Sequence, residues 1–117
     1  VRMYVCGPTV YDHPHLGHAR CYITWDVLYR LLLSLKPAYN LTVAYARNIT
    51  DVDDKILARA KETGRTPQAV AAENIQRFHE AMASLNVLPP THEPKATEHI
   101  ATMQEGIARL VENGYAY

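Results

Sequence analysis

Cysteine is scarce in this chain of 117 residues, which contains only Cys6 and Cys21. Two thiols do not make the framework of a disulfide-stabilised secreted domain, so we expect a reducing, cytoplasmic setting. Long apolar runs are also missing. The longest, residues 31–35, is far shorter than the roughly 20 residues that a membrane span requires, and no signal peptide is visible. These absences argue against a disulfide-rich protein and against a membrane protein.

A surplus of charge of one sign is missing too. Lys and Arg together number 12, as do Asp and Glu, so the formal net charge is zero. We therefore expect no broad electrostatic attraction to nucleic acid, and any RNA contact must come from local patches or from other segments. The hydrophobic fraction of 48% supports one domain with a real core. Because Val1 lies inside an expected strand and an extended segment begins near Tyr117, we expect a piece of a longer protein.

The first part of the chain predicts a strand, a long helix and a second strand. Residues 2–6 are rich in strand formers and are followed by Gly7. A helix is predicted from about residue 16 to residue 35, ended by Pro37, and a strand over residues 41–46. The helical prediction rests on apolar residues at helical spacing: Ala19, Ile23, Val27, Leu28, Leu31, Leu32 and Leu35. A strand, helix and strand in this order predict two parallel strands.

The rest of the chain predicts helices only. The first runs from about residue 53 to residue 62 and is closed by Gly64, the next begins at Thr66 and Pro67, and the last covers residues 97–113. This order fits an α/β fold: the first half of an open, Rossmann-like parallel sheet at residues 2–47, followed by a helical segment at about 53–113.

Two histidines stand where such a sheet collects its ligands, beyond the carboxyl ends of the strands. His15 and His18 share one helix face because they are three residues apart, and they lie in the first turn, where free N–H groups and the helix dipole attract anions. Gly17 between them lets a ligand approach the backbone. Imidazoles placed there could stabilise charge during phosphoryl or nucleotidyl transfer. The alternative is that two surface histidines happen to begin a helix.

Cys6 ends the first predicted strand and is expected to face the same crevice. It is either a buried apolar thiol or a zinc ligand, and the residues alone leave both open. His13 could join it, but the spacing matches no familiar zinc module, so further ligands would lie outside the chain. Cys21, inside the predicted helix, is interpreted as a packing residue.

Three aspartates follow the second predicted strand: Asp51, Asp53 and Asp54. They could hold Mg²⁺, but acidic residues at a helix start, with Thr50 or Asp51 as the cap, are the simpler interpretation. Thr50, at the carboxyl end of the strand, is better placed to touch a ligand.

Blocks spread over the whole chain resemble the amino-terminal catalytic region of cysteinyl-tRNA synthetases. They are Cys-Gly-Pro-Thr-Val-Tyr-Asp at 6–12, His-Leu-Gly-His-Ala-Arg at 15–20, Arg-Asn-Ile-Thr-Asp-Val-Asp-Asp-Lys-Ile at 47–56, Glu-Pro-Lys-Ala-Thr at 93–97 and Gly-Tyr-Ala-Tyr at 114–117. Their joint occurrence in this order is far more specific than the His-x-Gly-His tetrad alone.

The resemblance implies a class I aminoacyl-tRNA synthetase, with residues 1–117 as the amino-terminal part of a Rossmann-like (HUP-type) catalytic domain. It implies that ATP, used with Mg²⁺, and L-cysteine form cysteinyl-adenylate, and that the cysteinyl group then passes to tRNA(Cys). Cys6 would be one ligand of a zinc ion that binds the substrate thiolate, and Gly7 and Thr50 would help hold the cysteine. The histidines would be catalytic, within an ATP-binding signature of four residues: His15, Leu16, Gly17 and His18.

Parts of the family pattern do not occur in this chain. The second signature, Lys-Met-Ser-Lys-Ser, and the remaining zinc ligands, a Cys, a His and a Glu, are absent, so we expect this segment to be inactive alone. Alternatives remain: the related cysteine ligase of mycothiol synthesis, a nucleotidyltransferase that uses His-x-Gly-His without cysteine, and a non-catalytic binding fragment.

Overall fold

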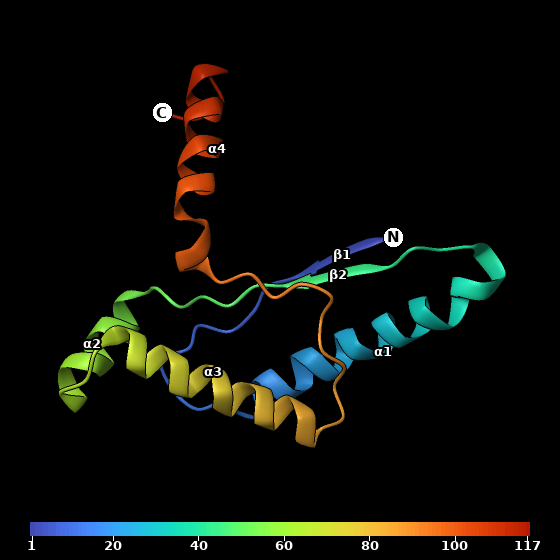
Figure 1. The fold of residues 1–117 in the computed structure, drawn as a ribbon, viewed down its shortest axis with the longest axis horizontal. Coiled ribbons are helices and arrows are strands. Elements are labelled where there is room, and N and C mark those ends of the chain that lie inside the picture. The colour runs from blue at the N-terminus through green and yellow to red at the C-terminus, as the bar shows by residue number, and fades with distance from the viewer.

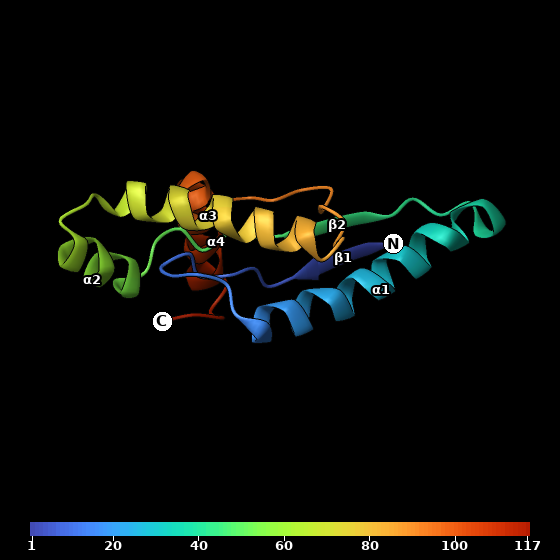
Figure 2. The same cartoon turned by 90° about the horizontal axis from the view of Figure 1, so that it is seen from below.

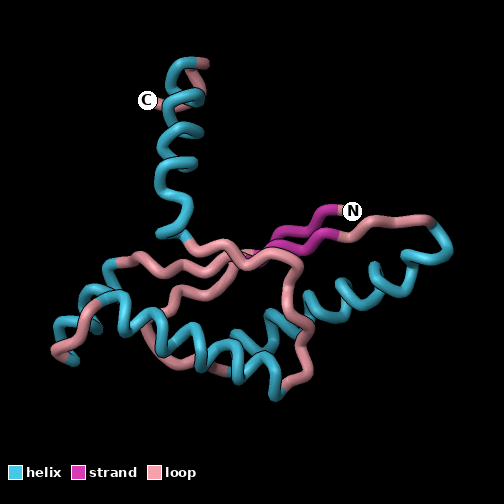
Figure 3. Tube along the Cα trace, in the orientation of Figure 1, coloured by secondary structure: helices cyan, strands magenta, loops and turns pink.

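The computed structural model describes residues 1–117, in which a strand, a helix and a strand are followed by helices (Figures 1 and 3). The elements are β1 (Arg2–Val5), α1 (Leu16–Tyr39), β2 (Ala44–Arg47), α2 (Asp54–Thr63), α3 (Pro67–Ser84), the 3-10 helix η1 (Ala96–His99) and α4 (Ile100–Glu112). This order confirms the prediction of an α/β chain that begins with a strand, helix and strand.

The two strands are parallel neighbours, as predicted. Arg2 lies opposite Ala44 and Val5 lies opposite Arg47. The second strand was predicted to begin at Leu41, but it begins at Ala44, the residue that pairs with the start of β1. Because the strands are parallel, both carboxyl ends reach the same edge of the sheet, which is the condition for a ligand site there.

A third extended segment borders β2 on its other side, and the sequence analysis did not predict it. His92 forms a parallel bridge with Ala46, and Lys95 forms one with Ile49. The N–H of Arg47 donates to the His92 carbonyl at 3.0 Å, and the N–H of Ile49 donates to the Pro94 carbonyl at 2.9 Å. Prolines in and before this segment lower its strand signal. The bridges nevertheless bring the residues after α3 alongside the carboxyl end of β2.

Helices α1, α2 and α3 lie on one side of the strands (Figure 1). Helices α1 and α3 cover one face of the sheet, whereas α4 stands away on the opposite side (Figures 1 and 2). The largest fully buried side chains come from strand ends, loops and helices alike: Phe78, Ile49, Ile56, Val10 and Val70. The core therefore lies between the sheet and helices α1, α2 and α3, and it supports the loops beyond the strand ends. No helix combines the length and apolar character that crossing a bilayer demands.

Helix α1 differs from its prediction in its end and in its buried face. It continues through Pro37 to Tyr39 and stops at Asn40, whose left-handed backbone (φ 48°) caps it. Pro37 is tolerated because it lies in the last turn and removes only one helical hydrogen bond. The predicted aliphatic stripe is largely exposed, with Val27 63% and Leu31 53% accessible.

The buried face of α1 instead carries Tyr22, Asp26 and Tyr29. Asp26 is buried because its carboxylate accepts the Leu88 N–H at 2.9 Å and pairs with Arg30 at 2.6 Å. Cys21, interpreted above as a packing residue, is exposed because it lies beside this face rather than on it.

The last predicted helix is two elements in the structure. η1 covers the first turn and α4 the remainder, and no residue of α4 is buried. Its large apolar side chains are all at least 43% exposed: Ile100, Met103, Ile107, Leu110 and Val111.

Candidate active site

Two loops meet at the carboxyl edge of the sheet, one after β1 and one after β2. The N–H of Gly7 donates to Asn48 Oδ1 at 2.9 Å. Further along, the N–H of Thr50 donates to the Pro8 carbonyl at 3.0 Å, and the N–H of Val10 donates to the Thr50 carbonyl at 3.2 Å. The structure therefore brings Cys6, Gly7 and Thr50 to one edge, as the sequence analysis predicted.

Gly7 is required by the close approach of these loops. A Cβ atom at this position would lie 1.4 Å from the Asn48 carbonyl oxygen, far inside any van der Waals contact. The glycine N–H is already bonded to Asn48, so it is not free for a ligand. Gly7 therefore contributes space, not a hydrogen-bond donor.

His15 and His18 form a reciprocal cap at the start of α1. Gly17 N–H donates to His15 Nδ1, and His15 N–H donates to His18 Nδ1, both at 3.1 Å. The ring centroids are 4.0 Å apart. Because both Nδ1 atoms accept hydrogen bonds, the proton of each neutral ring resides on Nε2. The pair thus keeps two Nε2–H donors for a ligand.

The surroundings of His18 favour the neutral form of its ring. Partial burial, and secondarily the nearby His15, lower the pKa of His18 from its ordinary value of 6.5. A neutral ring keeps Nδ1 free to accept the His15 N–H, so the cap and the tautomer support each other.

The cap also changes how an anion could bind at this helix start. The sequence analysis expected free backbone N–H groups in the first turn, but Gly17 N–H is bonded to His15 Nδ1 and His18 N–H donates to the His15 carbonyl at 2.9 Å. The imidazole Nε2–H groups are therefore the donors that these two residues offer. Gly17 has a steric role as well, because a Cβ there would lie 2.8 Å from the His15 ring.

Tyr22 contacts both the histidine pair and the loop after β1, which begins with Cys6. Its hydroxyl donates to the Cys6 carbonyl at 3.2 Å, and its ring stacks on His18 with centroids 6.4 Å apart. Burial, the largest influence, raises the pKa of Tyr22 well above its ordinary value of 10.0, so the phenol stays protonated and remains a donor. The two groups predicted from sequence are thus held by one side chain of α1.

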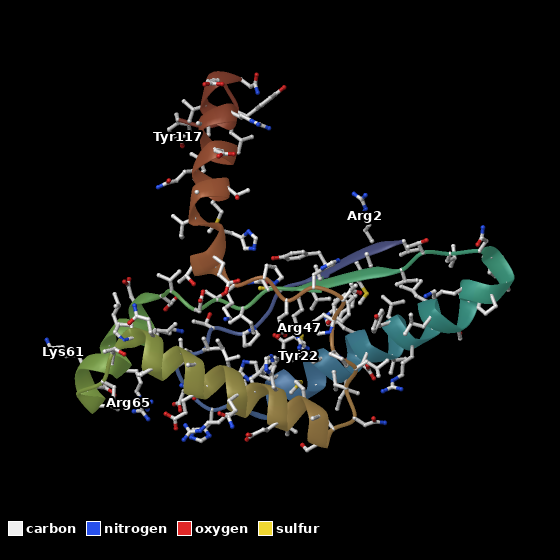
Figure 4. The ribbon with its side chains drawn as sticks, viewed as in Figure 1. Arg2, Tyr22, Arg47, Lys61, Arg65 and Tyr117 are labelled. Atoms are coloured by element: carbon white, nitrogen blue, oxygen red, sulfur yellow. The ribbon has the colours of Figure 1, made fainter.

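Arg47 is a buried cation behind this edge, and the sequence analysis did not single it out as a site residue. Its guanidinium carbon lies 5.2 Å from the centroid of Tyr22 and 4.9 Å from that of Phe78. Figure 4 shows Arg47 and Tyr22 next to one another between the strands and the helices. Nε and Nη2 of Arg47 both donate to Glu93 Oε1, at 3.1 and 2.7 Å, and Glu93 Oε2 lies 2.5 Å from His79 Nε2. No local pattern reveals this network, because its residues are far apart in sequence.

The Cys6 thiol is exposed, so the alternative of a buried apolar thiol is wrong. An accessible cysteine is a donor type that zinc accepts, and Cys6 therefore fits the part of one ligand. The chain holds no group of three or more His, Cys, Asp or Glu side chains that could hold a metal ion. Cys6 and His13 therefore do not belong to a complete metal site within residues 1–117, and a zinc ion at Cys6 would need ligands from elsewhere.

The aspartates after β2 have structural partners. Asp53, not Thr50 or Asp51 as predicted, caps α2, because its side chain accepts the Lys55 N–H at 2.9 Å. The Asp51 carboxylate accepts the N–H and the hydroxyl of Thr97, at 2.9 and 2.5 Å. These contacts support the structural interpretation of the acidic run over a Mg²⁺ site.

Comparison with known proteins extends over every residue of the chain. Residues 1–117 match the family described as tRNA synthetases class I (C) catalytic domain. Cysteine–tRNA ligases of Gluconobacter oxydans and Rhodospirillum rubrum are each 56% identical to the chain, and that of Xanthobacter autotrophicus is 57% identical, in each case over 117 residues. The aligned region is 100% of this chain and 25% of each relative, so the chain spans about a quarter of the length of these curated relatives.

The fold agrees with this match. Parallel β1 and β2 joined by α1, with the histidine pair at the start of α1 and Cys6 at the end of β1, form part of a Rossmann-like arrangement. The chain belongs to the class I (C) tRNA synthetase catalytic domain family.

Proposed function

We propose that the protein containing this chain is a cysteine–tRNA ligase, in which residues 1–117 form the amino-terminal part of the Rossmann-like catalytic domain. The observation that carries the proposal is the 56% identity to cysteine–tRNA ligases along the entire chain. The paired histidines and the accessible Cys6 at one sheet edge support it. The substrates would be ATP with Mg²⁺, L-cysteine and tRNA(Cys), and the two free cysteines agree with a cytoplasmic enzyme.

In the first step, a carboxylate oxygen of cysteine attacks the α-phosphorus of ATP, and the bond to the pyrophosphate leaving group breaks. Negative charge increases on the phosphoryl oxygens as this happens. The Nε2–H groups of His15 and His18 are suited to donate to those oxygens, because the Nδ1 atoms are occupied as acceptors in the cap. Leu16 and Gly17 complete the ATP-binding signature, with Gly17 leaving room for the His15 ring.

The substrate cysteine would lie beside the loops after β1 and β2. The Thr50 hydroxyl accepts from Asn48 and so keeps its proton to donate, and Gly7 provides the space in which the loops close. Cys6 would be one ligand of a zinc ion whose other ligands come from outside residues 1–117. Zinc would supply selectivity, because it binds a thiolate in preference to the hydroxyl of serine. In the second step, a hydroxyl of the terminal adenosine of the tRNA attacks the cysteinyl carbonyl and AMP leaves.

The alternatives are less well supported. A mycothiol-type cysteine ligase and a cysteine-independent nucleotidyltransferase are not favoured by the cysteine–tRNA ligases that match the whole chain. A nucleotidyltransferase would also leave the exposed Cys6 at the functional edge without a role.

The experiment compares the full-length protein with its Cys6→Ser variant. The wild type should bind about one zinc ion, exchange pyrophosphate into ATP only when cysteine is present, and charge tRNA(Cys). Cys6→Ser should lose most of the metal and most of the cysteine-dependent exchange. Cys21→Ser is the matched control, because this second thiol is also exposed but lies within helix α1 and not in a loop beyond a strand. Normal zinc content and exchange in Cys6→Ser would contradict the role given to Cys6, and exchange without cysteine would contradict the proposed activity.

A further inference from the structure

Asn48 spans the two loops that would hold the substrate amino acid. Its Oδ1 accepts the Gly7 N–H at 2.9 Å, and its Nδ2 donates to Thr50 Oγ1 at 3.2 Å. The orientation of the amide is determined by its first partner, because a backbone N–H can bond only to the oxygen end. The nitrogen end must therefore face Thr50.

This contact fixes what the Thr50 hydroxyl can do. Oγ1 receives a hydrogen bond from Asn48, and the hydroxyl proton of Thr50 is donated to no group of residues 1–117. A hydroxyl that already accepts is left with its proton to donate elsewhere. With one lone pair occupied by Asn48, the Thr50 hydroxyl keeps its proton for donation to a ligand at the sheet edge.

We propose that Asn48 is a positioning residue that presents the Thr50 hydroxyl as a donor to an oxygen of the substrate amino acid, its carboxylate being the strongest acceptor there. The same side chain ties the Thr50 loop to Gly7, next to Cys6. One amide therefore sets both the direction of the hydroxyl proton and the spacing between the two loops. This inference rests on the proposed function, because it concerns how the same edge binds cysteine.

Only an amide fits both contacts with the required polarity. An aspartate at position 48 keeps the shape and still accepts the Gly7 N–H, but it offers an acceptor to Thr50 in place of a donor. The Thr50 hydroxyl must then donate inward, and its proton is lost to the substrate. The substitution Asn48→Asp therefore reverses the hydroxyl while changing the packing little.

The test uses the full-length protein and cysteine-dependent ATP–pyrophosphate exchange. Loss of a hydrogen bond to a charged group predicts that Asn48→Asp raises KM for cysteine on the order of tenfold or more. KM for ATP should change less than about twofold, because the histidines are untouched. Asn113→Asp, the same chemical change at the exposed cap after α4, is the matched control and should leave both constants unchanged.

Variants at position 50 separate positioning from folding. Thr50→Val should raise KM for cysteine by about the same factor as Asn48→Asp, and Thr50→Ser should restore it, since serine keeps the hydroxyl. In the Thr50→Val background, Asn48→Asp should add less than about a further twofold, because the two residues act through one hydroxyl. If Asn48→Asp does not fold, Asn48→Ala, which removes the donor to Thr50 Oγ1, takes its place in the comparison with Thr50→Val.

Several outcomes overturn the inference alone: a wild-type KM in Asn48→Asp, a wild-type KM in Thr50→Val, or full additivity of the two substitutions. Equal increases in the KM for ATP and for cysteine would also overturn it, because they indicate a general structural role. A wild-type protein with no cysteine-dependent exchange instead overturns the proposed function, and the role of Asn48 falls with it.

Discussion

Replacement of Gly7 by alanine tests whether the close approach of the two loops is needed to form the site. The new Cβ would lie 1.4 Å from the Asn48 carbonyl oxygen, whereas ordinary contacts begin at 3.4 Å. The loops must therefore separate by about 2 Å, the difference between these two distances, which is enough to break the Gly7–Asn48 hydrogen bond. Overpacking costs about 1–3 kcal/mol and a lost hydrogen bond about 1 kcal/mol. We therefore expect a local cost of about 2–4 kcal/mol.

Hydrogen–deuterium exchange of the full-length protein measures this cost where it occurs. The amides of Thr50 and Val10 bond across the two loops, so their exchange should accelerate on the order of thirtyfold or more in Gly7→Ala, since 1.4 kcal/mol is a factor of ten. KM for cysteine should rise as well. Gly106→Ala is the control, because a Cβ there meets nothing within 4 Å, and alanine within a helix is favourable. Wild-type exchange at Thr50 and Val10 in Gly7→Ala would refute the steric argument.

Two further predictions concern the caps of α1 and α2. Because the pKa of His18 is lowered from 6.5 in the folded chain, the unfolded chain takes up a proton at this residue more readily. The contribution of His18 to the free energy of unfolding should therefore be fully present above about pH 6.5 and fall as the pH drops toward the folded pKa. His18→Gln, which can still accept the His15 N–H, should flatten this part of a thermal-unfolding series from about pH 5 to 8, and an unchanged slope would contradict the shift. Asp53→Ala should destabilise α2 by about 1 kcal/mol, whereas Asp53→Asn should cost little; exchange rates of the Lys55 amide measure both, and equal rates in the two variants would rule out a capping role.

The sequence was sufficient for the parts of the fold that local patterns control. Strand-forming residues and helical spacing predicted β1, α1 and β2, and the parallel rule then placed Cys6, His15 and Thr50 at one edge. Helical spacing predicted the wrong buried face for α1, because it selected aliphatic side chains that the structure leaves largely exposed. Asp26 lies on the observed buried face and is buried by contacts with Arg30 and Leu88, and a partner 62 residues away leaves no local signal.

The same limit applies to the site. The sequence identified the side chains that could carry chemistry, but not the ones that orient them. Asn48 is only two residues from Thr50 in sequence, yet its bond to Gly7 spans 41 residues. The histidine cap is visible only once both Nδ1 atoms are seen to accept hydrogen bonds. Orienting contacts of this kind depend on which loops the fold brings together, and residue types do not encode that directly.

The rigidity of the functional edge comes from side chains more than from the sheet. β1 and β2 are four residues each, too short for their ladder alone to hold the loops beyond them. Tyr22 links Cys6 to α1, and Arg47 contacts the rings of both Tyr22 and Phe78 while pairing with Glu93. Since one guanidinium nitrogen of Arg47 stays buried without a partner, this arrangement carries a desolvation cost that its other contacts must offset. It follows that the position of Cys6 depends on packing between α1, α3 and the segment that follows α3, well away from the thiol itself.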